Sequence, residues 1–160
     1  MSQQGFRPYG SLAGDLTQAT FPFVVSNGIK ITAGNAVNLV GGYLENCALN
    51  DTVGVLGVAA ETVTGNTTAG TTCGVFTDPN LVYYNTTQTL LELAQSSVGK
   101  CFKIATQSGK QYISLTAGAV NSGYAFICLK INPDGDGDQT KGLWKIYKGQ
   151  LFNATTDGLQ

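Results

Sequence analysis

Residues 101–115, "CFKIATQSGKQYISL", decide the fold class of this chain. Two apolar, partly alternating runs stand on either side of a short polar turn at Ser108-Gly109. Their apolar members are Phe102, Ile104, Tyr112, Ile113 and Leu115. Two such runs joined by a glycine turn of two to four residues predict an antiparallel β-hairpin.

The same pattern continues outward from this hairpin in both directions. The chain of 160 residues contains 21 glycines, and they separate short segments rich in Thr, Val, Ile and Tyr. Predicted strands cover 29–32, 36–40, 43–48, 55–63, 71–77, 81–85, 100–106, 111–116, 124–131 and 143–151. Many short, evenly spaced strands predict a mostly β, antiparallel fold, closed or nearly closed as a small barrel or sandwich because closure removes exposed edges.

Helical periodicity occurs in one place only, residues 86–97, "TTQTLLELAQSS". Leu90, Leu91 and Leu93 share one side of a helix in this segment, and a threonine precedes them as a possible N-cap. We therefore expect at most one short helix.

The N-terminal segment 1–24 has neither the period of a strand nor that of a helix. Its stretch 5–12, "GFRPYGSL", places aromatic residues and an arginine next to a proline, which is typical of interface hot spots. We predict an extended N-terminal arm over 1–24 that gains its order from a partner, a β-barrel-like domain over 25–153 and a C-terminal tail over 154–160. A disordered terminus is the alternative for the arm.

Charge and composition exclude several classes of function. The formal net charge is −1 and the nine basic residues are scattered, which disfavours binding to nucleic acid or to an anionic membrane. No apolar run is long enough to span a bilayer, and the start resembles no signal peptide, so synthesis in a cytoplasm is expected. Four widely spaced cysteines (Cys47, Cys73, Cys101, Cys128) are expected to be buried free thiols, with disulfides as the alternative.

Catalytic and metal signatures are weak. The chain has no histidine, which removes every Ser-His-Asp, Cys-His and His-metal arrangement. Cys101 stands between two lysines, but a buried strand thiol is the simpler interpretation. In "NPDGDGDQTKG", Asp134, Asp136 and Asp138 alternate as in a calcium loop, yet the later positions of that motif do not match, so a solvated hairpin loop is favoured over a weak cation site. We predict no enzyme activity and no cofactor.

Several stretches, taken in order, resemble the capsid decoration (cement) proteins of tailed bacteriophages. They are "GFRPYGSLAG" (5–14), "ITAGNAVNLVGG" (31–42), "VLGVAAE" (55–61), "GVFTDPNLVYYNTTQ" (74–88), "SSVGKCFKI" (96–104) and "AFICLKINPDGDGDQTKGLWKIYKGQLF" (125–152). The resemblance covers nearly the whole chain, and the shared order of the pieces carries it more than any one of them does.

The resemblance implies a small β-barrel or β-tulip domain that binds the outside of a phage head, bridges subunits of the major capsid protein and forms a homotrimer. The N-terminal arm would be the part that docks on the shell. Its expected docking residues are Phe6, Arg7, Pro8 and Tyr9. A second expected contact between subunits is the middle turn with Phe76, Asp78, Pro79, Tyr83 and Tyr84.

Two other functions stay open on the sequence alone. A receptor- or carbohydrate-binding module on a phage head or tail fibre would use Trp144, Tyr147 and Tyr124 as a stacking platform. A hydrolase would need two carboxylates that face each other across a cleft, separated by roughly 5 to 10 Å.

Overall fold

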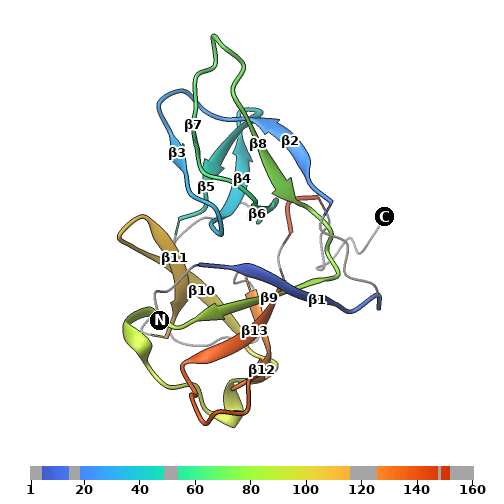
Figure 1. Cartoon of the computed structure of the whole chain (residues 1–160), viewed down its shortest axis with the longest axis vertical. Coiled ribbons are helices and arrows are strands. Elements are labelled where there is room, and N and C mark those ends of the chain that lie inside the picture. Colours follow the sequence, from blue (N-terminus) through green and yellow to red (C-terminus); the bar gives the residue numbers. More distant parts are fainter. Residues whose placement is uncertain (1–4, 15–18, 49–53, 116–125, 148, 152–160) are drawn as a thin grey trace.

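The computed structural model describes residues 5–14, 19–48, 54–115, 126–147 and 149–151, and within them the chain is almost entirely β (Figure 1). The strands are β1 (Arg7–Ser11), β2 (Phe21–Val24), β3 (Lys30–Ile31), β4 (Ala36–Val40), β5 (Tyr43–Asn46), β6 (Gly57–Ala59), β7 (Val63–Thr64), β8 (Thr72–Phe76), β9 (Leu81–Thr86), β10 (Cys101–Gln107), β11 (Lys110–Ser114), β12 (Phe126–Ile131) and β13 (Lys141–Ile146). All pair in antiparallel fashion within three sheets. The predicted mostly β, antiparallel class is confirmed.

The six-stranded sheet has the order β1-β9-β13-β12-β10-β11 and curls until its last strand returns to β9. A parallel bridge joins Thr87, directly after β9, to Ile113 on β11. The side-chain amide of Asn85 also donates to the carbonyl oxygen of Gln111, at 3.1 Å. We call this body the six-stranded lobe; it forms the lower half of Figure 1.

The five-stranded sheet, β2-β8-β6-β4-β5, curls in the same way. Val25, directly after β2, forms a parallel bridge with Leu44 on β5, and the amide of Ser26 donates to the Leu44 carbonyl at 3.0 Å. The two-stranded β3-β7 ribbon lies beside this sheet, and together they form the five-stranded lobe in the upper half of Figure 1. The chain therefore contains two curled sheets where one barrel was expected over 25–153.

Each lobe is built around its own apolar cluster. The five-stranded lobe encloses Val25, Ile31, Val37, Leu44, Leu56, Ala59, Cys73 and Val75. The larger cluster fills the six-stranded lobe and extends into the other lobe through Ala36, Val58 and Phe76. In this cluster Trp144 packs edge-to-face on Phe102 and donates its indole N–H to the carbonyl of Asn85 at 3.2 Å. The four cysteines are buried and none of them is in a disulfide, which confirms the prediction of buried thiols.

The hairpin 101–115 forms as predicted. Strands β10 and β11 pair from Lys103 opposite Ser114 to Gln107 opposite Lys110. The two turn residues, Ser108 and Gly109, both have positive φ, at 52° and 76°. Such values match the tight turn whose twist suits a two-residue hairpin.

The segment 86–97 forms no α-helix, which agrees with the expectation of at most one short helix. The segment contains two short 3-10 turns, Gln88–Leu90 and Gln95–Ser97, separated by extended backbone. Thr87 is held in the bridge to Ile113, and its hydroxyl donates to the Leu91 carbonyl at 2.5 Å, which closes a loop instead of a helical turn. Thr89 and Leu90 both have φ of 55°. Left-handed backbone at a β-branched and a bulky residue costs on the order of 1–3 kcal/mol each.

The N-terminal segment is not an arm without partners. Within its described residues, β1 pairs with β9 in the six-stranded lobe, and β2 pairs with β8 in the five-stranded lobe. The segment thus crosses from one lobe to the other (Figure 1). A bulge explains why no period was visible: the register shifts between Pro8 and Gly10, so alternation breaks at Tyr9. The expected tail over 154–160 lies outside the described residues.

Side-chain amides join the two lobes. Gln111 on β11 is fully buried; it accepts from the Ala36 amide at 2.6 Å and donates to the Cys47 carbonyl at 2.9 Å. Gln150 reaches β4 from near the C-terminal end, where it accepts from the Leu39 amide and donates to the Leu39 carbonyl, at 2.7 and 2.9 Å. Each glutamine side chain thus makes the backbone hydrogen bonds that a neighbouring strand would otherwise make. In the described residues, no helix is long and apolar enough to cross a membrane.

Candidate functional site: a groove between the two lobes

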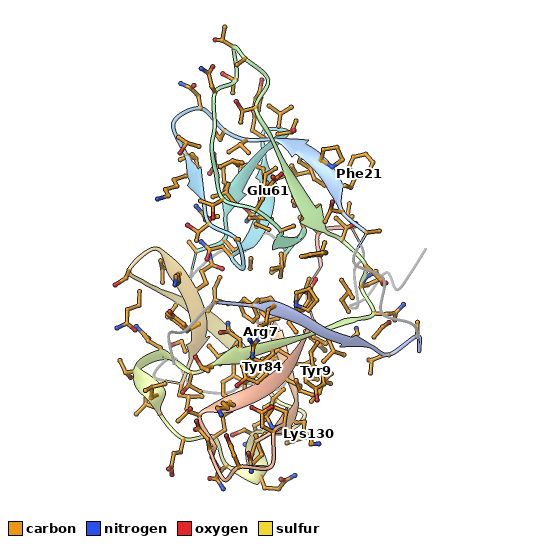
Figure 2. All side chains as sticks on the ribbon, in the orientation of Figure 1. Arg7, Tyr9, Phe21, Glu61, Tyr84 and Lys130 are labelled. Atoms are coloured by element: carbon orange, nitrogen blue, oxygen red, sulfur yellow. The ribbon has the colours of Figure 1, made fainter. Side chains whose placement is uncertain are left out.

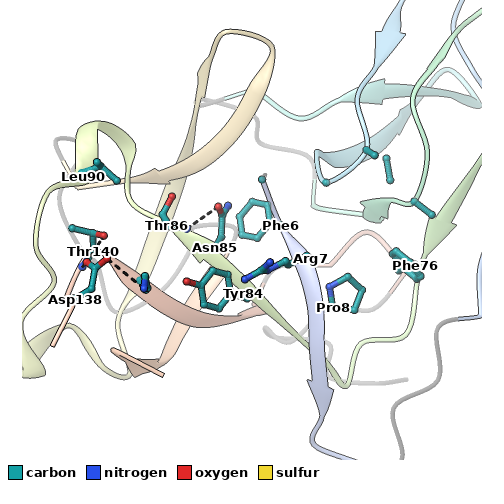
Figure 3. Close-up of a pocket in the computed structure, with 16 residues that line it drawn as sticks. Phe6, Arg7, Pro8, Phe76, Tyr84, Asn85, Thr86, Leu90, Asp138 and Thr140 are labelled. Carbon is teal, nitrogen blue, oxygen red and sulfur yellow. Dashed lines mark hydrogen bonds and ion pairs between the residues drawn. The ribbon is translucent and has the colours of Figure 1, made fainter. Parts of the chain in front are cut away.

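A groove of about 980 Å³ opens where the two lobes meet. Its lining comes from β1 and the residues before it, from the turns of the five-stranded lobe, and from β9 and β13 with their flanking loops (Figure 3). The residues that matter for its chemistry are Phe6, Arg7, Pro8, Phe76, Tyr84, Asn85, Thr86, Leu90, Asp138, Thr140 and Lys141. A cavity of this size is within the usual range for ligand and peptide sites.

The start of β1 anchors the groove because Phe6 is part of the core. Its ring is 2% exposed, stacks on Phe126 with centroids 4.1 Å apart, and meets Tyr83 edge-on. The amide of Phe6 donates to the Gly34 carbonyl of the other lobe at 2.8 Å. This approach needs Gly5, whose φ is +78° and where a Cβ would stand 3.0 Å from the Gly34 oxygen.

Arg7 supplies a positive charge at the middle of the groove. Its guanidinium lies 4.2 Å from the centre of the Tyr84 ring, in a cation–π contact that orients it. Among the described residues no carboxylate forms an ion pair with it. Tyr84 in turn donates to Asp134 at 3.4 Å, and burial, followed by the charge of Asp134, raises the pKa of its phenol. The Arg7 guanidinium is therefore fixed in place and free to bind an anion.

Lys141 fills the centre of the aspartate loop. Its ammonium lies 3.5, 2.5 and 3.5 Å from carboxylate oxygens of Asp134, Asp136 and Asp138. A side chain of the protein therefore takes the position between these carboxylates that a calcium loop gives to an ion. In the part of the chain that the structure describes, no group of three or more His, Cys, Asp or Glu residues is arranged to hold a metal.

The loop with Asp134, Asp136 and Asp138 should make the stability of the protein depend on pH in the acidic range. The hydrogen bond from Lys141 lowers the pKa of Asp136, and hydrogen bonds from Thr140 lower that of Asp138, both from 3.8. Because the folded pKa values are depressed, the stabilisation is present above 3.8 and is lost as pH falls through the lower folded values. We expect the thermal midpoint to fall over this range. Lys141→Met should reverse the dependence, since protonation then relieves repulsion between the carboxylates; an unchanged profile in that variant would contradict this.

The predicted arm residues have different positions in the structure. Arg7 and Pro8 line the groove, and Phe6 stands at its floor with its ring turned into the core. Phe6 is therefore not available as a docking anchor, which corrects that expectation. Tyr9, at the bulge of β1, is 51% exposed and does not line the groove.

The residues predicted for the middle turn also have different positions in the structure. Phe76 and Tyr84 line the groove beside Arg7 and Pro8, so two distant segments singled out in the sequence meet at one site. Tyr83 is fully buried, and burial raises the pKa of its phenol, so a contact of Tyr83 with another subunit is wrong for this structure. Asp78 and Pro79 form a surface turn, in which the Asn80 amide donates to Asp78 at 2.8 Å.

Of the residues expected for the alternative functions, Trp144 and Cys101 are buried and Tyr147 is partly buried. Trp144 is fully buried and cannot form a stacking platform for sugars; Tyr124, its expected neighbour there, lies outside the described residues. Burial raises the pKa of the Cys101 thiol, the opposite of what a nucleophile needs. Among the described lining residues of the groove, Asp138 is the one carboxylate, whereas glycoside hydrolysis requires a facing pair.

Several groove residues, Lys141, Leu90 and Thr86 among them, were not anticipated from the sequence as part of a site. Leu90 lies at one end of the groove, opposite Phe76 and Pro8 (Figure 3), and Lys141 also lines it. Thr86 lines the middle, and its hydroxyl oxygen is buried without a hydrogen-bond partner. One feature of the sequence could have indicated the role of Lys141: it follows Asp138 by three residues, close enough to pair with the aspartates of the loop.

Comparison of the chain with protein-family models, with curated proteins and with solved structures gives no match.

Proposed function

We propose that the protein is a non-enzymatic capsid decoration protein of a tailed bacteriophage, which binds the outer surface of the head and bridges subunits of the major capsid protein. The observation that carries this is the meeting of two segments on which the resemblance depends. Arg7 and Pro8 of the N-terminal segment and Phe76 and Tyr84 of the middle segment line one surface groove.

Exposed apolar side chains on the N-terminal segment support a contact between this segment and the shell. Tyr9, Leu12 and Phe21 are all more than half exposed and belong to the same N-terminal segment. Figure 2 shows Tyr9 on the six-stranded lobe and Phe21 on β2 of the five-stranded lobe. A surface that presents apolar anchors from both lobes suits adhesion to a large, regular partner.

Contact would be made by side chains and not by strand addition. β1 and β2 are the outer strands of their sheets, and each contains a proline, Pro8 and Pro22, that has no N–H to offer. Proline on an edge strand discourages pairing with another chain. We therefore expect the N-terminal segment to dock on the shell without adding a strand to a capsid sheet.

Binding to undecorated heads of the phage that encodes the chain tests the proposal. The triple variant Tyr9→Ser, Leu12→Ser, Phe21→Ser should lose saturable binding in a co-sedimentation assay, because it removes the apolar contacts while leaving the core intact. Deletion of residues 1–20 is unsuitable, since it also removes β1 and the buried Phe6.

A matched control uses exposed apolar residues elsewhere. Val40 and Tyr43 face each other across the β4-β5 turn and are similarly exposed. The variant Val40→Ser, Tyr43→Ser should bind heads as the wild type does. Absence of wild-type binding, or equal loss in both variants, would contradict the proposal.

A further inference from the structure

One loop of the six-stranded lobe presents apolar and acidic side chains to solvent. Leu90 is 57% exposed, Leu91 is also exposed, and Glu92 follows them on the surface. Among the described residues no lysine or arginine forms an ion pair with Glu92. The loop therefore offers a partner two adjacent apolar side chains and one negative charge.

The backbone holds this loop in its exposed form. Thr89 and Leu90 have left-handed φ values, and the Thr87 hydroxyl ties the loop by its bond to the Leu91 carbonyl. On the far side Leu93 is buried, and its amide donates to the Gln139 carbonyl at 2.8 Å. Strained backbone persists where the surroundings impose it, and it is often found at binding sites.

The groove has the complementary chemistry. Arg7 offers a guanidinium that no described carboxylate neutralises, and Thr86 offers a buried hydroxyl without a partner. Pro8 and Phe76 provide an apolar wall at one end. The carboxylates at the other end, Asp138 included, surround Lys141 rather than Arg7.

Loop and groove are adjacent on the surface, because Leu90 itself lines the end of the groove (Figure 3). Each copy can therefore dock its loop on one neighbour and receive the loop of another, head to tail around a ring. A surface and its complement on neighbouring parts of one subunit are what a closed, symmetric assembly needs.

We propose that the protein self-associates by docking loop 88–92 of one copy into the inter-lobe groove of another, with Glu92 of the first paired to Arg7 of the second. Leu90 and Leu91 pack along the apolar wall, and the Thr86 hydroxyl bonds the docked segment. Only the expected number of subunits, three, rests on the proposed function; the contact itself rests on the loop and the groove.

Charge reversal tests the pairing. We expect wild-type protein to sediment as an oligomer, and Arg7→Glu and Glu92→Arg each to raise the dissociation constant by about tenfold or more, because each places like charges together. The double variant should recover most of the affinity. Lys30→Glu, an exposed charge on β3 away from the groove, is the matched control and should leave association unchanged.

A second variant separates docking from folding. Leu90→Gly relieves the positive φ and should raise the thermal midpoint of the isolated subunit while it weakens association. A monomeric wild type, unchanged association in the single charge variants, or no recovery in the double variant would each overturn the proposal. Head binding is measured independently, so oligomers that bind no heads would contradict the proposed function alone, and head binding without groove-dependent association would contradict this inference alone.

Discussion

Phe6→Ala is expected to lower the free energy of unfolding by about 3–5 kcal/mol, the range for deleting a buried aromatic ring. Phe6 is 2% exposed, and its ring lies between Phe126 and Tyr83, so its loss leaves a cavity in the core of the six-stranded lobe. Equilibrium unfolding in guanidinium chloride measures the change. If Phe6 belonged to a free docking arm, the same substitution would leave stability unaltered.

Tyr9→Ala is the matched control for Phe6→Ala. Tyr9 lies three residues further along the chain, in β1, with half of its surface in water, so its truncation should change stability by no more than about 0.5 kcal/mol. Equal losses for the two variants would show that the strand as a whole, and not the stacked ring, stabilises this region.

Local pattern predicted most of the strands because the relevant physics is local. The hairpin 101–115 formed as expected, since alternation and a glycine turn specify both the strands and their register. The division into two lobes was not predictable. It depends on the bridges Val25–Leu44 and Thr87–Ile113, which join residues far apart in the chain, and local alternation does not reveal such contacts. The missed β1 has the same kind of cause, a bulge at Tyr9 that removes the alternation.

The candidate site was predicted in part. Arg7, Pro8, Phe76 and Tyr84 were singled out by residue type, and they do line one groove. The role of Phe6 was inverted, because an aromatic residue in a segment without periodicity looks the same in sequence whether it packs inside or outside. Leu90 was assigned to a helix face, since leucine spacing does not reveal that the backbone turns left-handed there.

Gln111→Ala is expected to lower the free energy of unfolding by about 2–5 kcal/mol, because it removes two buried hydrogen bonds and leaves a cavity between the lobes. The Ala36 amide loses its acceptor and the Cys47 carbonyl loses a donor. Gln107→Ala, on the exposed end of β10 in the same hairpin, should be nearly neutral. If the Gln111 hydrogen bonds couple the two lobes, the Gln111→Ala variant should unfold in two transitions, one for each lobe, in place of one.

Gln111→Glu tests the hydrogen-bond geometry, because it keeps the shape of the side chain. A carboxylate can accept from the Ala36 amide but cannot donate to the Cys47 carbonyl, whereas the protonated acid can do both. Burial and the facing carbonyl should therefore raise the folded pKa of the introduced carboxyl above its unfolded value of about 4.3. Its stabilising contribution is then present below that value and is lost as pH rises through the folded pKa. The free energy of unfolding that the variant loses relative to the wild type should be smaller at about pH 4 than at about pH 8. A larger loss at the lower pH would mean that Gln111 does not donate to Cys47.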